Sequence, residues 1–191
     1  MPELKSLVTA LTGNDEPGAE AAALILAEAG EPAVPLLLPL LDSPDSEQRW
    51  WAVRTLAGMR RPRAEWFRRA LTDPEPDVRA AGALGLVTHP DVSAHVELIS
   101  VLDDRDGLVA DLGSKALAAL GSEVVPRLID AFLGATPQAR IHILRALAQI
   151  RDPQAIRVMM RAMDQGSAAL EYWAKEGLNR LGLDMVYLKP E

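Results

Sequence analysis

The chain has 191 residues and a formal net charge of −7, from 20 basic and 27 acidic side chains. It contains no cysteine, which excludes disulfides, thiolate metal sites and cysteine nucleophiles. Apolar residues make up 49% of the chain but aromatic residues only 4%, so the predicted core is aliphatic. The longest apolar run, residues 33–41, is far shorter than the ~20 residues that span a bilayer. With no signal peptide visible, we expect a cytoplasmic protein without membrane partners.

A unit of about 30 residues repeats along the chain. Leucines recur at regular spacing along the chain. The residues four positions and one position before each leucine are mostly small, which lets a partner helix approach closely. Turn signals separate each leucine-bearing helix from a shorter apolar stretch before it. The predicted helix–turn–helix repeats are residues 1–30, 31–60, 61–90, 91–121, 122–151 and 152–182. Their leucines are Leu26, Leu56, Leu86, Leu117, Leu147 and Leu178.

The predicted helix ends have matching cap residues. Thr136 and Asp152 each offer an N-cap oxygen directly before a proline. Gly30, Gly121 and Gly182 each lie four residues after a register leucine, where a helix commonly ends in a left-handed residue. No alternating apolar pattern indicates a strand, so the sequence predicts an all-α fold.

One helix pair cannot bury its apolar face alone, so neighbouring pairs must stack and share a core. Residues 1–191 are therefore predicted to form a single helical-repeat domain. Residues 183–191 are too apolar for a free tail. We expect Leu183, Met185 or Val186, and Leu188 to cap the last repeat, with a dimer contact as the alternative.

The stretch from Asp73 to Leu86, which includes Val78-Arg79, resembles HEAT repeats. The period of about 30 residues resembles the short subtype found in phycobilin lyases. This resemblance implies a right-handed α-solenoid of about six helix–turn–helix repeats. In HEAT repeats an acid at the end of the first helix commonly meets an arginine of the second, which implies the pairs Asp42–Arg49 and Asp73–Arg79.

The resemblance also implies that the second helix of each pair lines a concave face. Counting 100° per residue from each leucine places the position six before it toward solvent and the position five before it at the edge. Two aromatic pairs occupy these positions, Trp50–Trp51 and Tyr172–Trp173. Exposed Trp and Tyr are typical anchors for a partner. For Trp51 and Trp173, packing between adjacent repeats is the open alternative.

No catalytic set accompanies these aromatic residues. The three histidines are far apart in register and lack metal-ligand spacing, and no phosphate loop or nucleophile elbow occurs. We therefore predict a non-enzymatic interaction scaffold without metal or cofactor, which binds a protein partner or a second copy of itself on the concave face. The acidic balance argues against nucleic acid. The predicted binding residues are Trp50, Trp51, Arg54, Leu84, Leu112, Lys115, His142, Arg145, Tyr172 and Trp173.

The resemblance to phycobilin lyases gives an alternative function of a different class. It implies binding of a bilin or other tetrapyrrole, as a lyase, a chaperone or a pigment-degradation adaptor. A flat conjugated ligand stacks on Trp and Tyr, and its propionates need Arg or Lys. Two groups could provide such a place, Trp50, Trp51, Arg54 and Leu84 in one, and His142, Arg145, Tyr172 and Trp173 in the other.

Charge is distributed unevenly along the chain. Residues 1–48 have nine acidic side chains and one lysine, whereas residues 49–69 have seven arginines and one glutamate. The basic patch Arg60–Arg69 could bind an acidic partner. Alternatively it is a solvated turn and outer helix face whose aliphatic stems cover apolar surface. Trp66 and Phe67 in this patch are expected to fill the core side of their helix.

Overall fold

The computed structural model describes residues 2–13, 15–164 and 167–183. The helices group into two compact units, Met1–His89 and Pro90–Glu191. The boundary falls at the predicted junction between the third and fourth repeats. The described residues contain α-helices and short 3-10 helices and no strand, which confirms the all-α helical-repeat fold.

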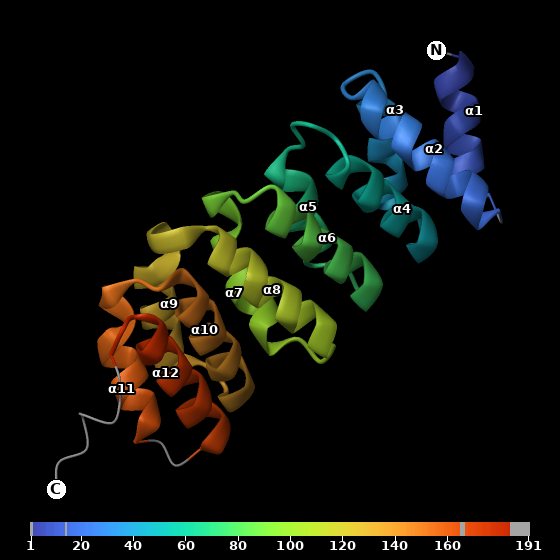
Figure 1. Ribbon diagram of the computed structural model, residues 1–191. Helices are drawn as coiled ribbons and strands as arrows, with labels where there is room; N and C mark the ends of the chain where they lie inside the picture. Colours follow the sequence, from blue (N-terminus) through green and yellow to red (C-terminus); the bar gives the residue numbers. More distant parts are fainter. Residues whose placement is uncertain (1, 14, 165–166, 184–191) are drawn as a thin grey trace, which may run out of the picture. The chain divides into compact units, whose positions relative to one another are not determined.

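The first unit contains three helix pairs (Figure 1). The second helix of the middle pair, α4, packs against the second helices of both neighbouring pairs, α2 and α6. Pro35 and Pro39 stand in the first helix of the middle pair, which continues as a 3-10 helix. The helices are α1 (Pro2–Leu11), α2 (Glu16–Ala29), α3 (Val34–Leu37), η1 (Leu38–Asp42), α4 (Ser46–Ala57), α5 (Ala64–Ala70) and α6 (Pro76–Thr88).

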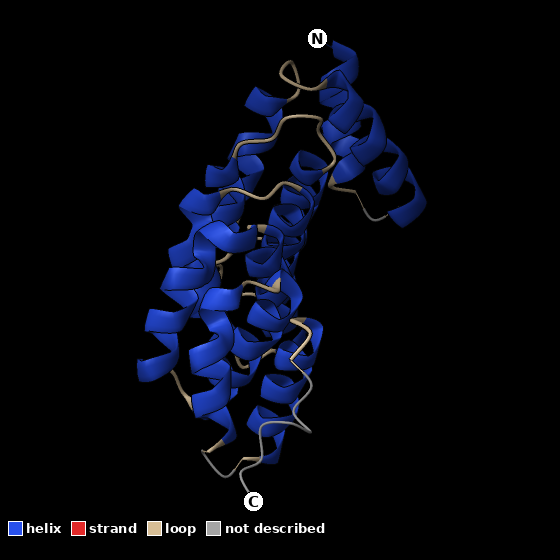
Figure 2. Ribbon diagram, turned by 60° about the vertical axis from the view of Figure 1, so that its left-hand side comes forward, coloured by secondary structure: helices blue, strands red, loops and turns tan. Residues whose placement is uncertain are grey.

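The second unit repeats this arrangement, with α10 packed against both α8 and α12. Every element drawn in colour in Figure 2 is a helix or a connecting loop. The helices are η2 (Val92–Ala94), α7 (His95–Ser100), η3 (Val101–Asp103), α8 (Gly107–Ala119), η4 (Gly121–Val124), α9 (Val125–Gly134), α10 (Pro137–Ile150), η5 (Pro153–Ala155), α11 (Ile156–Met163) and α12 (Ala168–Arg180).

The predicted caps are confirmed. The Thr136 hydroxyl accepts from the Ala139 N–H at 3.2 Å, and the Asp152 carboxylate accepts from the Gln154 N–H at 2.9 Å. Gly30, Gly121 and Gly182 have φ angles of 65°, 68° and 79°, the left-handed region expected after a helix. The expected C-terminal cap lies outside the described residues, apart from Leu183.

The register leucines are confirmed as the core. All six are at most 1% exposed. The small residues beside them permit close packing: a Cβ added at Gly85 would lie 2.7 Å from the ring of Phe67, and one added at Gly82 would lie 2.8 Å from the Cβ of Ala70. Because α5 carries both of these neighbours, the glycines of α6 allow the two helices of one repeat to touch. Trp66 and Phe67 are both buried, as expected.

We predict that Gly85→Ala destabilises the chain although alanine is the better helix former. The new methyl group would overlap the buried Phe67 ring, and overpacking of this kind costs about 1–3 kcal/mol. Gly134→Ala is the matched control, because Gly134 also lies in a helix but has open space at its Cβ position. Urea unfolding of both variants would check this, and equal or higher stability of Gly85→Ala would contradict the packing argument.

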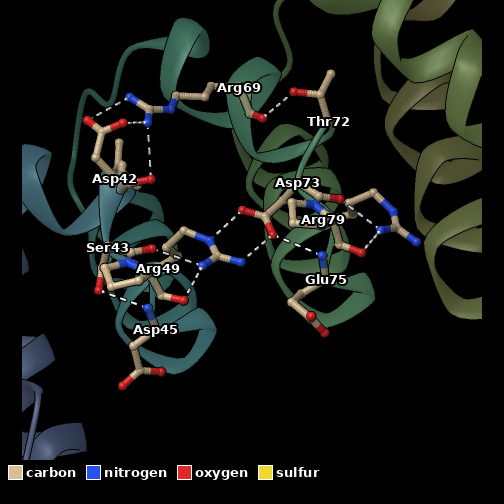
Figure 3. A network of polar contacts seen from close by, with 12 residues as sticks. Asp42, Ser43, Asp45, Arg49, Arg69, Thr72, Asp73, Glu75 and Arg79 are labelled. Atoms are coloured by element: carbon tan, nitrogen blue, oxygen red, sulfur yellow. Dashed lines mark hydrogen bonds and ion pairs between the residues drawn. The ribbon is translucent and has the colours of Figure 1, made fainter.

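The expected pairing of acid and arginine within one repeat is wrong (Figure 3). Arg49 binds Asp73 of the following repeat through Nε and Nη2, at 2.7 and 2.8 Å, instead of Asp42. Asp42 pairs with Arg69. Arg79 donates to the main-chain carbonyls of Asp73 and Pro74 at 2.8 and 2.9 Å.

The shared role of these arginines is to bind carbonyl groups at the end of the preceding helix or in the turn. Arg49 donates to the carbonyl of Ser43 at 2.9 Å, and Arg140 donates to those of Phe132 and Leu133, both at 3.1 Å. Carbonyls in the last turn of a helix lack partners within that helix, and a guanidinium can satisfy them. Each arginine therefore fixes the turn within its own repeat, and Arg49 takes its acid, Asp73, from the turn of the next repeat.

The Arg49–Asp73 pair is nearly buried, with both side chains 11% exposed. Burial would raise the pKa of the Asp73 carboxyl. Hydrogen bonds from Arg49 and the Glu75 N–H, together with the charges of Arg49 and Arg79, outweigh burial and hold this pKa below its usual value. Asp73 therefore stabilises the folded chain above the pKa of the unfolded carboxyl and loses that effect as the pH falls through the folded value.

We predict that Arg49→Gln lowers the free energy of unfolding by about 3 kcal/mol, because it leaves Asp73 unpaired in a nearly buried place. Arg180→Gln is the control. It removes an i,i+4 pair with Glu176 whose side chains are 34% and 33% exposed, and should cost about 0.5 kcal/mol. Chemical denaturation at neutral pH would measure both, and similar losses in the two variants would contradict a special role for Arg49.

Candidate functional site: two arginine–aromatic clusters

The structure partly corrects the expected exposure of the aromatic side chains. Tyr172 is 61% exposed, and Trp50 and Trp173 are half-buried. Trp51 and His142 are each only 3% exposed. For Trp51 this agrees with packing, the alternative left open above, and for His142 it contradicts an accessible binding residue. Both stand five positions before a register leucine, at the edge of the predicted exposed face, and there the neighbouring repeats cover them.

The first cluster consists of Glu20 on α2 with Trp50, Trp51 and Arg54 on α4. The guanidinium carbon of Arg54 lies 5.1 and 5.2 Å from the ring centroids of Trp50 and Trp51. The two indoles meet edge to face, with centroids 4.8 Å apart. Both carboxylate oxygens of Glu20 bind Arg54, one through Nη1 and the other through Nη2 at 2.7 Å. The cluster is thus a guanidinium held between indole rings and a carboxylate.

Exposed leucines flank this first cluster. Leu24 on α2 and Leu84 on α6 are 61% and 52% exposed. Both stand two positions before their register leucine, as Arg54 does in α4. The second-helix face of the first unit therefore combines apolar side chains with one paired arginine, a composition typical of the centre of a protein interface.

The second cluster consists of Asp111 on α8, His142 and Arg145 on α10, and Tyr172 and Trp173 on α12. Arg145 pairs with Asp111 through Nη1, and its guanidinium carbon lies 5.1 Å from the Trp173 ring centroid. Tyr172 and Trp173 meet edge to face at 5.2 Å. The second cluster therefore has the same chemical parts as the first, with its rings supplied by the following repeat.

His142 is the buried member of the second cluster. Its Nδ1 lies 3.5 Å from Asp111 Oδ1 and 3.5 Å from Arg145 Nη1, and its Nε2 lies 3.1 Å from the side-chain amide of Gln138. Burial lowers the pKa of this imidazole below its usual value, Arg145 lowers it further, and Asp111 opposes both. His142 is therefore a neutral packing and hydrogen-bonding residue at neutral pH.

Three members of the two clusters correspond at a spacing of 91 positions, whereas the other aromatic residues do not. Glu20 matches Asp111, Arg54 matches Arg145, and the buried ring of Trp51 matches that of His142. The sequence predictions included the arginines and rings but missed the pairing of the two acids with them. Comparison of the repeats in blocks of three would have revealed it, because both acids stand six positions before a register leucine and both arginines two positions before the next one.

The remaining predicted site residues lie apart from these polar contacts. Leu112 is half-buried on α8. Lys115 is exposed on the same helix and forms no ion pair in the described part of the chain. In the basic patch, Arg69 pairs with Asp42, and Arg60 and Arg61 are exposed beside a hollow that Glu28 and Glu31 also line.

Within the described residues, no group of three or more His, Asp or Glu side chains is placed to hold a metal ion. His89 contacts the Ala57 carbonyl at 2.9 Å and stacks on Phe67, so it serves the packing of the first unit. No helix of the described chain is long and apolar enough to cross a membrane.

Comparison with known families first defines the class. Residues 4–83 match the family model of HEAT repeats, and residues 139–165 match that of the PBS lyase HEAT-like repeat. The bilin biosynthesis protein RpcF of Synechococcus sp. (strain WH8020) is 30% identical over 165 residues, which cover 80% of this chain and 74% of RpcF. The chain belongs to the family of HEAT-repeat proteins that includes RpcF.

Two further matches agree with this family. The phycocyanobilin lyase subunit beta of Nostoc sp. (strain PCC 7120) is 37% identical over 94 residues. The match covers 49% of this chain and 46% of that relative, so the chain spans less than half of its length. A solved structure of the complex of CpcE and CpcF of phycocyanin lyase from Nostoc is also similar, with a TM-score of 0.59 at 26% identity. The match covers 75% of this chain and 96% of the matched chain in that complex.

Similarity of fold extends to designed proteins. A designed armadillo repeat protein in complex with the peptide (KR)4 has a TM-score of 0.54 at 16% identity, and the match covers 94% of this chain and 99% of the designed one. At this identity the match shows the helical-repeat fold alone.

We predict that the stability of the chain falls between about pH 7 and 5 in part because of His142. The folded chain binds a proton at His142 less readily than the unfolded chain does. The stabilisation is therefore complete above the unfolded pKa of about 6.5 and declines below it. His142→Gln should reduce this decline, and His95→Gln, outside the cluster, should retain it. Urea unfolding across this pH range would test the assignment, and an identical pH profile for His142→Gln would refute it.

Proposed function

We propose that the chain binds a bilin at an arginine–aromatic cluster and works together with a protein partner. The observation that carries this proposal is the guanidinium packed on indole rings in both units, in a family whose named members include phycobilin lyase subunits. The tetrapyrrole alternative of the sequence analysis is thereby better supported than the interaction scaffold alone.

The chemistry of a linear tetrapyrrole fits the parts of the clusters. Its conjugated rings present flat apolar faces that can stack on Trp and Tyr. Its two propionate groups carry negative charge, and a guanidinium is well suited to bind a carboxylate through two parallel hydrogen bonds. Tyr172 offers the most exposed aromatic surface in either cluster, and Trp50 is its half-buried counterpart in the first.

The proposed partner is another helical-repeat subunit or the protein that receives the pigment. The CpcE–CpcF structure is a complex of two chains, which supports assembly as the working state of this family. On the second-helix face of the first unit, Leu24 and Leu84 would supply apolar contact area. Any covalent attachment of pigment would then belong to the assembled complex, and the chain alone would bind and orient the pigment.

Titration with biliverdin, a linear tetrapyrrole with two propionates, tests this proposal. We expect saturable quenching of tryptophan fluorescence and a shift in pigment absorbance at micromolar concentrations. The double variant Trp50→Ala with Tyr172→Ala should bind at least about twofold more weakly, because each lost aromatic contact contributes about 0.5–1.5 kcal/mol and the pigment loses at least one. Met160→Ala is the control, since Met160 is 45% exposed on α11, away from both clusters. Absence of any spectral change with the unaltered chain would remove pigment binding from consideration.

A further inference from the structure

The two matched arginines differ in how completely their hydrogen-bond donors are used. In the first cluster, both η nitrogens of Arg54 bind the two oxygens of Glu20. In the second, a single oxygen of Asp111 contacts Nη1 of Arg145. Nε of Arg145 is buried and has no hydrogen-bond partner among residues 2–13, 15–164 and 167–183. Nη2 of Arg145 likewise makes no hydrogen bond within the described residues.

The same chain shows what normally fills this edge of an arginine. Nε and Nη2 of Arg49 point in parallel to the two carboxylate oxygens of Asp73, at 2.7 and 2.8 Å (Figure 3). Two parallel donors in one plane match the two oxygens of a carboxylate, and this arrangement is the strongest that an arginine makes with a carboxyl group. In Arg145 no acceptor from the described part of the chain lies at the corresponding edge.

The basic side chains of α12 that follow Trp173 are paired with acids of the same helix. On α12, Lys175 pairs with Glu171, and Arg180 binds Glu176 at 2.6 Å. Asp111 is 40% exposed in its side chain and can rotate toward solvent, whereas Arg145 is 21% exposed and rests against Trp173. A donor without an acceptor destabilises the folded chain. Nε is covered in the unliganded chain and Nη2 is not, so a ligand carboxylate would meet Nη2 first and would reach Nε when Arg145 shifts on the Trp173 ring.

We propose that the Nε–Nη2 edge of Arg145 binds a carboxylate of the ligand, while the conjugated body of that ligand lies against Trp173 and Tyr172. This inference rests on the proposed function and assigns the carboxylate-binding role to the second unit. Arg54 does not share that role, because Glu20 already occupies its two η nitrogens. Arg145 thus selects ligands that combine a flat conjugated body with an anionic carboxyl group.

A pair of pigments that differ only in their carboxyl groups tests this assignment. Biliverdin has free propionates, and its dimethyl ester has the same conjugated system without the negative charges. The unaltered chain should bind biliverdin at least about tenfold more tightly than the ester, as expected for a hydrogen-bonded charge pair. Arg145→Gln should remove this preference while the ester still binds. Arg54→Gln, the matched control in the first unit, should keep it.

The outcomes separate the two proposals. If neither pigment binds the unaltered chain, the proposed function fails and this inference with it. If both pigments bind equally, or if Arg54→Gln and not Arg145→Gln removes the preference, pigment binding stands and the role of Arg145 is overturned. Retained binding of the ester shows that a variant is folded. If Arg145→Gln binds neither pigment, Arg145→Lys takes its place as the test variant. Lysine keeps the charge that Asp111 requires but lacks the planar edge, so it should reduce the preference for biliverdin over the ester at least about threefold.

Discussion

Every element of this chain depends on the close contact between the two helices of each repeat. A single short helix pair has too little apolar surface to be stable, so its leucine must be completely buried against neighbouring helices. Gly82 and Gly85 let α5 reach α6 closely enough for Phe67 to pack against glycine instead of a side chain. The positions of the second helices, and hence of both clusters, follow from this contact.

Arginine has two distinct tasks in the chain, set by its place in the repeat. Near the start of a second helix, Arg49, Arg79 and Arg140 bind main-chain carbonyls of the preceding helix end or turn and so fix the turn. Near the middle of a second helix, Arg54 and Arg145 lie on aromatic rings and bind an acid of the previous repeat. Arg140 also lies over the ring of Phe132, at 5.4 Å, but that ring is only 1% exposed. The rings beside Arg54 and Arg145 include partly exposed ones, which a ligand could meet together with the guanidinium.

Sequence periodicity predicted the fold well because it reflects which side chains must be buried and where a helix must end. The buried leucines, the small neighbours of Leu86 and the left-handed glycines all follow from local geometry. The sequence left the burial of Trp51 open, and it mispredicted the accessibility of His142 and the partner of Arg49, all for one reason. A helical wheel gives the direction of a side chain around its own axis, but it contains no information on how far the next repeat is displaced along that axis. Contacts between repeats depend on that displacement.

The spacing of 91 residues between matched positions has a consequence for how the chain can change over generations. It extends from Gly30 and Gly121 to the acids, the arginines and the buried rings, a pattern that tandem copying of a three-repeat block leaves behind. When a block exists twice, one copy can retain the ancestral chemistry while the other accumulates substitutions. Glu20 against Asp111, and Trp51 against His142, are differences of this kind: a carboxylate one methylene shorter and a smaller ring, beside arginines that are the same in both blocks.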